Sequence, residues 1–116
     1  MNRLENINYL HLLYDAYGVL LTKKQQDYFE MYYFEDLSLA EIAENLNVSR
    51  NAIHNNLQAT LSHLHNYESK LGIIKKERDL NNYLDDLVYQ GKITNEDLSN
   101  INKIFNGVDE SGENIN

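Results

Sequence analysis

The absence of proline is the feature that most limits what this chain can fold into. None of its 116 residues is proline, and its five glycines lie at positions 18, 72, 91, 107 and 112. Between the glycines, apolar residues recur every three or four positions, and no stretch alternates apolar and polar residues as a strand would. The sequence therefore predicts an all-α protein. Four of the glycines lie where helices should stop, because glycine takes the left-handed C-terminal position at least cost.

Two helices are expected in the first third of the chain. The first covers residues 4–17 and ends at Gly18. The second begins at Thr22, since Thr22 and Gln25 have the spacing of a capping box, in which two side chains satisfy free backbone N–H groups. This second helix is rich in aromatic residues, which are expected to form a packing face rather than a platform for nucleic-acid bases. They are Tyr28, Phe29, Tyr32 and Tyr33.

Residues 39–57 have the pattern of a helix-turn-helix. A second capping box, Ser38 with Glu41, opens a short helix that runs to Leu46, and Asn47 suits a left-handed turn residue. Ser49 then caps a long helix that ends at Gly72. Within the motif, the expected core comprises Ile42, Leu46, Ile53 and Leu57, with Ala43 at the closest approach and Val48 filling the turn. Farther along the long helix, the inward stripe is expected to continue through Leu61, Leu64 and Leu71.

The character of the chain changes after Gly72. Residues 75–79 form a charge-dense junction, and two further helices follow, one from Leu80 to near Gly91 and one that begins at Thr94. We expect them to pair as a C-terminal helical hairpin. The predicted organisation is a helix-turn-helix domain over residues 1–73, a helical extension over 74–106 and a disordered tail over 107–116. The fold class is thus an all-α helix-turn-helix bundle with a long recognition helix.

Composition excludes several classes of function. The chain has 10 Lys and Arg against 18 Asp and Glu, a net charge of −8, and no cysteine. Disulfides, cysteine-ligated zinc and thiol nucleophiles are therefore excluded. No secretory signal and no apolar run long enough to span a bilayer is present, so we expect a cytoplasmic protein without membrane insertion. His63 and His65 stand two apart and point to different sides of a helix. We expect no metal, no cofactor and no enzymatic activity.

The long helix carries the candidate nucleic-acid-binding residues. In a helix-turn-helix the first turns of the second helix enter the major groove, where Arg suits guanine and Asn or Gln suits adenine. Residues 51–67 contain no Asp or Glu, although the whole chain is acidic. Against this stands the scarcity of permanent cations, because Arg50 is the one on this helix face and phosphate contacts need Lys or Arg. The candidates are Ser49, Arg50, Asn51, His54, Asn55 and Gln58, with Lys23 and Lys24 as additional phosphate contacts.

Three stretches resemble one family. Residues 17–25 follow the pattern YG-x-LLT-x-KQ, residues 32–43 follow YY-x-x-DLSL-x-EIA, and Val48-Ser49-Arg50 continues with Ala52-Ile53. Over about residues 7–73 the chain is similar to the YlxM family of small bacterial helix-turn-helix proteins, which resembles the fourth region of primary sigma factors. That resemblance implies a modulator of the signal recognition particle. Asn47 departs from the family, which commonly has glycine at this turn, and Asn55 and Asn56 replace charged residues.

Three hypotheses follow. The leading one is a non-enzymatic accessory protein of the signal recognition particle pathway, which binds the particle's GTPase or its RNA. The alternative is a sequence-specific regulator of transcription that binds duplex DNA. The third is an assembly module that forms a homodimer through residues 74–105, since pairing would bury apolar positions that a three-helix core does not need.

Overall fold

The structure, a computed structural model, describes residues 3–107. Over these residues the chain forms helices and turns without any strand, which confirms the predicted all-α class. The chain divides into two compact units, residues 1–74 and residues 75–116. The elements are α1 (Arg3–Tyr17), the 3-10 helix η1 (Gly18–Leu20), α2 (Lys23–Tyr33), α3 (Leu39–Leu46), α4 (Arg50–Leu71), α5 (Ile73–Tyr89) and α6 (Asn95–Phe105).

The predicted helix starts are confirmed by the hydrogen bonds at their caps. The Gln25 N–H donates to Thr22 Oγ1 at 3.2 Å, and the Thr22 N–H donates back to Gln25 Oε1 at 3.0 Å. The same reciprocal pair joins Ser38 with Glu41 at the start of α3. At α6 it joins Thr94 with Asp97. Each capping box satisfies two backbone donors that a helix start otherwise leaves free.

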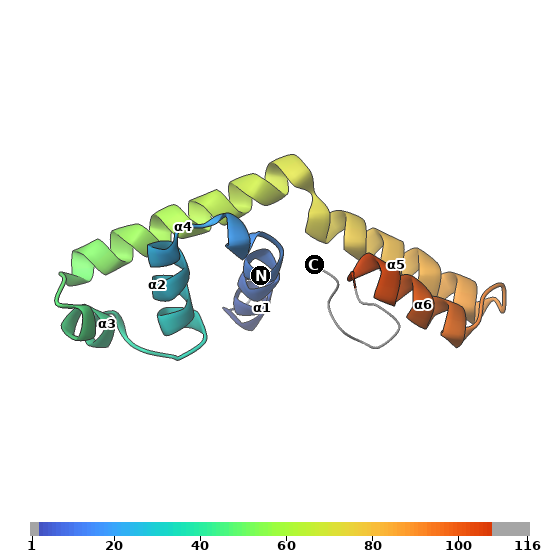
Figure 1. Ribbon diagram of the computed structural model, residues 1–116, viewed down its shortest axis with the longest axis horizontal. Coiled ribbons are helices and arrows are strands. Elements are labelled where there is room, and N and C mark those ends of the chain that lie inside the picture. Colours follow the sequence, from blue (N-terminus) through green and yellow to red (C-terminus); the bar gives the residue numbers. More distant parts are fainter. Residues whose placement is uncertain (1–2, 108–116) are drawn as a thin grey trace. The chain divides into compact units, whose positions relative to one another are not determined.

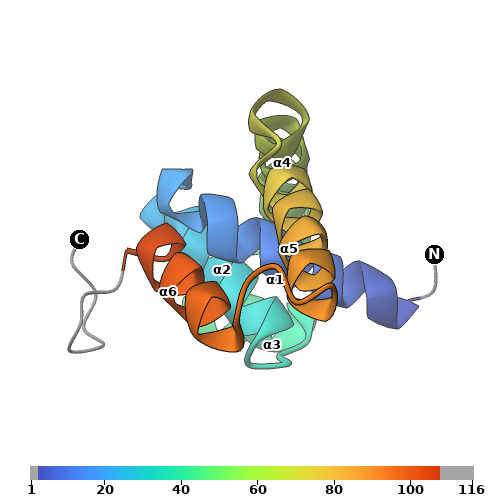
Figure 2. The same cartoon turned by 90° about the vertical axis from the view of Figure 1, so that its right-hand side faces the viewer.

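Helix α4 is the element on which the other helices of the first unit pack. Helices α1, α2 and α3 all pack on one side of it, and both α1 and α2 cross its axis (Figures 1 and 2). Its buried stripe serves two apolar clusters. The turn cluster lies near its N-terminus and consists of Tyr28, Ile42, Ala43, Ile53 and Leu57. The α1 cluster lies near its C-terminus and consists of Leu13, Tyr17, Leu21, Phe29, Leu64 and Ile74.

The aromatic face of α2 packs inside this unit, as predicted. Phe29 is fully buried, and its ring stacks on Tyr14 with centroids 4.5 Å apart. Burial, followed by a hydrogen bond to Glu30, raises the pKa of Tyr14 to about 12. The Tyr14 ring also explains Gly18, because a Cβ at that position would lie 3.1 Å from Tyr14 Cε2. Gly18 begins η1 without a positive φ, so the expectation of a left-handed stop holds only at Gly72, Gly91 and Gly107.

Some core predictions were wrong. Leu46 and Val48 flank the turn residue Asn47 and are each 37% exposed, because the left-handed backbone there redirects the chain and leaves both side chains at the surface. Leu71 is 46% exposed, since α4 ends at Gly72 and Ile74 of the next helix completes the α1 cluster instead. Thr60, which the apolar pattern passes over, is fully buried between Leu57 and Leu64.

A hydrogen-bonded tyrosine fixes the end of the first unit. The Tyr17 hydroxyl donates to Glu68 Oε1 at 2.5 Å and accepts from the Ile73 N–H at 3.0 Å. The Ile74 N–H donates to the same Glu68 oxygen at 3.0 Å. Two free donors at the start of α5 are thereby satisfied by side chains of α1 and α4. Burial, followed by the hydrogen bond to Glu68, raises the pKa of Tyr17.

The second unit holds the predicted helical hairpin. Its α5 already begins at Ile73, so the charge-dense residues 75–79 are helical rather than a junction. The Lys92 N–H donates to the Leu87 carbonyl at 2.9 Å around left-handed Gly91, which ends α5. Leu84 is buried, but several large apolar side chains are exposed, including Tyr83, Tyr89, Ile104 and Phe105. Most of the predicted disordered tail, residues 108–116, lies outside the described residues.

Tyr17→Phe is expected to lower the free energy of unfolding by about 1–3 kcal/mol, because it leaves the part-buried Ile73 N–H without its partner. Tyr83→Phe is the matched control, since Tyr83 is 63% exposed, and it should change stability by less than about 0.5 kcal/mol. Urea unfolding measures both variants, and amide hydrogen exchange at residues 73 and 74 locates the effect. Equal stabilities of the two variants would show that the Tyr17 hydrogen bonds contribute nothing.

Candidate nucleic-acid interface

The turn between α3 and α4 has the geometry that a helix-turn-helix needs. Asn47 adopts φ 56° and ψ 47°, a left-handed conformation that asparagine tolerates better than most residues. The Val48 N–H donates to the Ala43 carbonyl at 3.0 Å, and the Asn47 N–H donates to the Glu44 carbonyl at 3.3 Å. This pair of bonds is a Schellman motif. Ala43 is buried in the turn cluster together with Ile53 and Leu57 of α4, where the helix-turn-helix pattern predicts a small side chain.

Six of the candidate residues gather at the start of α4, and all are exposed. They are Ser49, Arg50, Asn51, His54, Asn55 and Gln58. The last five repeat at helical spacing on one exposed face, which adjoins the buried stripe of Ile53 and Leu57, so one ligand surface could contact them together. Ser49 has a structural task as well, since its hydroxyl accepts from the Ala52 N–H at 3.0 Å and caps the helix.

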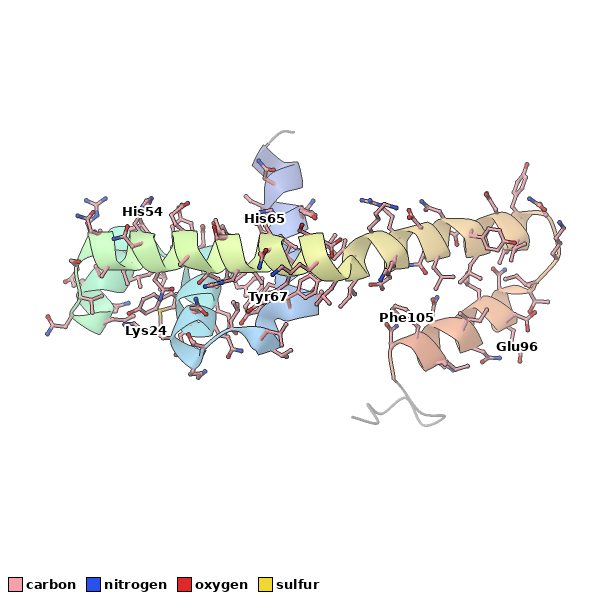
Figure 3. All side chains as sticks on the ribbon, turned by 90° about the horizontal axis from the view of Figure 1, so that it is seen from above. Lys24, His54, His65, Tyr67, Glu96 and Phe105 are labelled. Atoms are coloured by element: carbon pink, nitrogen blue, oxygen red, sulfur yellow. The ribbon has the colours of Figure 1, made fainter. Side chains whose placement is uncertain are left out.

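The two candidate lysines belong to α2 and lie apart from this face. Lys23 forms an ion pair with Asp27 at 2.8 Å, and the hydrogen bond in that pair raises the pKa of Lys23. The Lys24 ammonium lies 5.8 Å from the centre of the Tyr28 ring. In Figure 3, His54 and His65 lie along one edge of α4, whereas Lys24 lies beyond the opposite edge. The two lysines of α2 therefore do not both lie on the edge of α4 that carries His54.

Charge is distributed unevenly around the candidate face. Residues 51–67 of α4 contain neither acidic residues nor Lys or Arg, so histidines are the titratable side chains that could become cations there. Arg50 is the one permanent cation near the turn. Just before it, residues 25–49 contain six carboxylates and no Lys or Arg. The face can form hydrogen bonds with base edges or with a polar protein surface, but it provides little charge to neutralise phosphates.

A family model of helix-turn-helix proteins like YlxM and p13, named UPF0122, matches residues 4–104. The chain belongs to this family. Its helix-turn-helix is the structural feature that the family description names, and it agrees with the turn geometry above. The match also extends beyond residue 73, where the motifs in the sequence give no family signal, and includes the hairpin helices.

Individual members of the family are similar over shorter stretches. A UPF0122 protein of Thermoanaerobacter sp. strain X514 is 47% identical over 77 residues, which cover 66% of each chain. One from Desulforamulus reducens is 54% identical over 67 residues, 58% of this chain and 57% of the relative. One from Listeria innocua is 44% identical over 86 residues, 74% of this chain and 78% of the relative. The chain thus spans just under two thirds of the first relative's length.

Residues 3–107 offer no metal site and no membrane span. No group of three or more His, Asp or Glu side chains there could hold a metal ion. None of the helices in that part of the chain combines the length and apolar character that a bilayer crossing requires. The imidazole of His11 packs edge-on against Phe34, with centroids 4.7 Å apart, so it contributes to the aromatic packing of the first unit.

Ser49 allows the cap and the surface charge of the interface to be separated. Ser49→Ala should lower stability by about 1 kcal/mol, because the Ala52 N–H loses its acceptor. Ser49→Asp keeps an acceptor at the cap and should leave stability within about 0.5 kcal/mol of wild type, while adding a negative charge beside Arg50. Chemical unfolding of both variants tests the cap. An equal loss in the two variants would contradict its proposed role.

Proposed function

We propose that this protein is a non-enzymatic accessory protein of the signal recognition particle pathway, which binds the particle's GTPase or its RNA and changes GTP turnover. Membership of the YlxM-like family supports this role through the resemblance described above. The observation that carries the choice is the charge of the helix-turn-helix surface. A helix that neutralises several phosphates needs several cations, and α4 offers Arg50 followed by 17 residues without Lys or Arg.

A protein partner agrees better with the charge of the rest of the first unit. The six carboxylates of residues 25–49 are unaccompanied by any Lys or Arg in that stretch, and complementary charge speeds the encounter with a basic protein. The exposed polar side chains of α4, such as Asn55 and Gln58, can hydrogen-bond to RNA or to protein. Because this face of α4 has no acidic residues, the RNA of the particle is a second component that the protein can contact.

Binding should be measured with purified components in parallel. The chain has no cysteine, so Tyr89→Cys, at a residue of the second unit that is 92% exposed, gives one labelling position outside α4. We expect fluorescence anisotropy at physiological salt to show binding to the GTPase or RNA at least about tenfold tighter than to mixed-sequence duplex DNA, with a change in GTP turnover. No binding to either component and no change in turnover would overturn the proposal.

A transcriptional role is the second candidate, favoured by the exposure of Arg50, Asn51 and Asn55 on the first turns of α4. It predicts tight duplex binding that Arg50→Ala weakens, with the salt slope falling by about 1. Lys92→Ala removes one exposed cation from the hairpin and is the matched control. Duplex binding that is weak, or equally affected by the two substitutions, would argue against this role.

The hairpin supports a homodimer. Residues 75–79 together with Lys103, at one end of the hairpin, contain four cations and two carboxylates, while residues 85–97 at the other end contain one cation and four carboxylates. A two-fold antiparallel pairing would set each positive end against the partner's negative end and cover exposed Tyr83 and Phe105. Figure 3 labels Glu96 and Phe105 near opposite ends of α6.

Sedimentation velocity tests this pairing. We expect the full chain to sediment as a dimer at micromolar concentration, and Tyr83→Asp to shift it to monomer, since a charge would be buried in the interface. Val19→Asp is the control, because Val19 is 84% exposed in the first unit and its substitution should leave the dimer intact. A wild-type chain that stays monomeric at about 100 μM, where even a weak dimer would form, would contradict the pairing.

A further inference from the structure

A groove of about 470 Å³ lies on the first unit, away from the exposed face of α4. It is formed by α1, by the end of α2 and by the segment that leads into α3. Its walls are apolar and polar in about equal share, and they are only partly covered by the rest of the unit. The apolar lining comes from Ile7, Leu10, Tyr32, Tyr33 and Leu37.

The lining side chains differ in how far the fold itself uses them. Leu10 packs against the α1 cluster, Leu37 packs against the turn cluster, and Tyr33 contacts both. Ile7 belongs to neither cluster, although it is partly buried, and it faces the groove. The groove is therefore held in shape by both clusters, while its apolar surface extends beyond what either cluster buries.

Negative charge borders these apolar side chains. Asp36 and Glu41 both line the groove, and neither forms an ion pair within the described residues. Hydrogen bonds from Ser38 lower the pKa of Glu41. Since residues 25–49 contain no Lys or Arg, no nearby cation from that stretch offsets the field. The groove combines apolar side chains with two carboxylates that form no ion pair among the described residues.

We infer that this groove binds a basic amphipathic helix of a partner protein. An apolar stripe on such a helix would cover Ile7 and Leu37, and Lys or Arg beside the stripe would pair with Asp36 and Glu41. An extended peptide usually binds by adding to a sheet edge, and the part of the chain that the structure describes has no strand. The inference rests on the proposed function in one respect, that the partner is a basic protein.

The first test uses a model peptide on the full chain. The probe is an 18-residue helix of leucine and lysine with leucine at helical spacing, and its control has the same composition scrambled so that no apolar face forms. Amide chemical shifts should change around Ile7, Tyr33 and Leu37 with the amphipathic peptide. Binding should be about tenfold weaker with the scrambled one. Equal binding of the two peptides, or shifts confined to other surfaces, would overturn the inference.

The second test removes the charges of these two carboxylates without disturbing the backbone. Asp36 has φ 58°, which asparagine also tolerates, and glutamine can replace Glu41 in the capping box. The double variant Asp36→Asn with Glu41→Gln should therefore fold, and should weaken peptide binding about tenfold. Asp15→Asn with Glu44→Gln removes two exposed charges of the first unit that lie outside the groove, and should change affinity less than twofold. If both double variants weakened peptide binding equally, the attraction would depend on overall charge alone, and the inference would be overturned.

A third variant tests the apolar lining. Ile7→Asn adds no charge and lies outside both buried clusters, so the fold should persist. We expect at least about threefold weaker peptide binding, from the loss of one partly exposed apolar contact. Unchanged affinity would show that the peptide does not use the groove.

The signal recognition particle GTPase distinguishes failure of the groove from failure of the proposed function. If the GTPase binds the wild-type chain and the Asp36→Asn, Glu41→Gln variant equally well, the groove inference fails and the proposed function stands. If the peptide maps to the groove but neither the GTPase nor the RNA binds, the groove stands and the proposed function fails. A groove that a second copy of the chain occupies would appear as concentration-dependent shifts at Ile7 without peptide, and would also overturn the inference.

Discussion

The first unit depends on one buried stripe of α4. Ile53 and Leu57 close the turn cluster, and seven residues after Leu57 the same face supplies Leu64 to the α1 cluster. Burial of each such side chain contributes about 1.5–3 kcal/mol. Residues 51–67 contain no oppositely charged pair of the kind that supports an isolated helix, so packing must hold α4 together. The recognition face is thus a by-product of a helix whose other side carries both cores.

Local chemistry made much of the fold predictable. Thr22, Ser38 and Thr94 each announce a helix start because a capping box involves residues only three positions apart. What escaped prediction depends on contacts between distant residues. The hydrogen bond between Tyr17 and Glu68 joins positions 51 apart, and no local pattern reveals it. The core assignment of Leu71 failed for a related reason. Apolar spacing does not reveal that α4 ends at Gly72, which leaves Leu71 exposed.

The candidate face was predictable as a location but not as an activity. Helical spacing placed Arg50, Asn51, His54, Asn55 and Gln58 on one surface, and the structure has all of them exposed there. Which partner binds this surface depends on charge. The charges of the α2–α3 segment are as important for this choice as those of α4. The groove beside Asp36 was missed altogether, because it needs α1 and the α2–α3 segment to come together. Its one signal in the sequence was the absence of Lys and Arg from residues 25–49.

The packing of both clusters on α4 has a consequence for how the chain folds during its synthesis. Synthesis proceeds from the N-terminus, so α1, α2 and α3 leave the ribosome before the residues that cover them. Tyr28 and Ile42 lack their partner until Leu57 emerges, and Leu13 and Phe29 wait for Leu64 and Ile74. Because both clusters include side chains of α4, neither can form before those residues of α4 have been synthesised. The nascent first unit should therefore close its turn cluster first and its α1 cluster only after Ile74 has emerged, and expose its aromatic residues to chaperones until then.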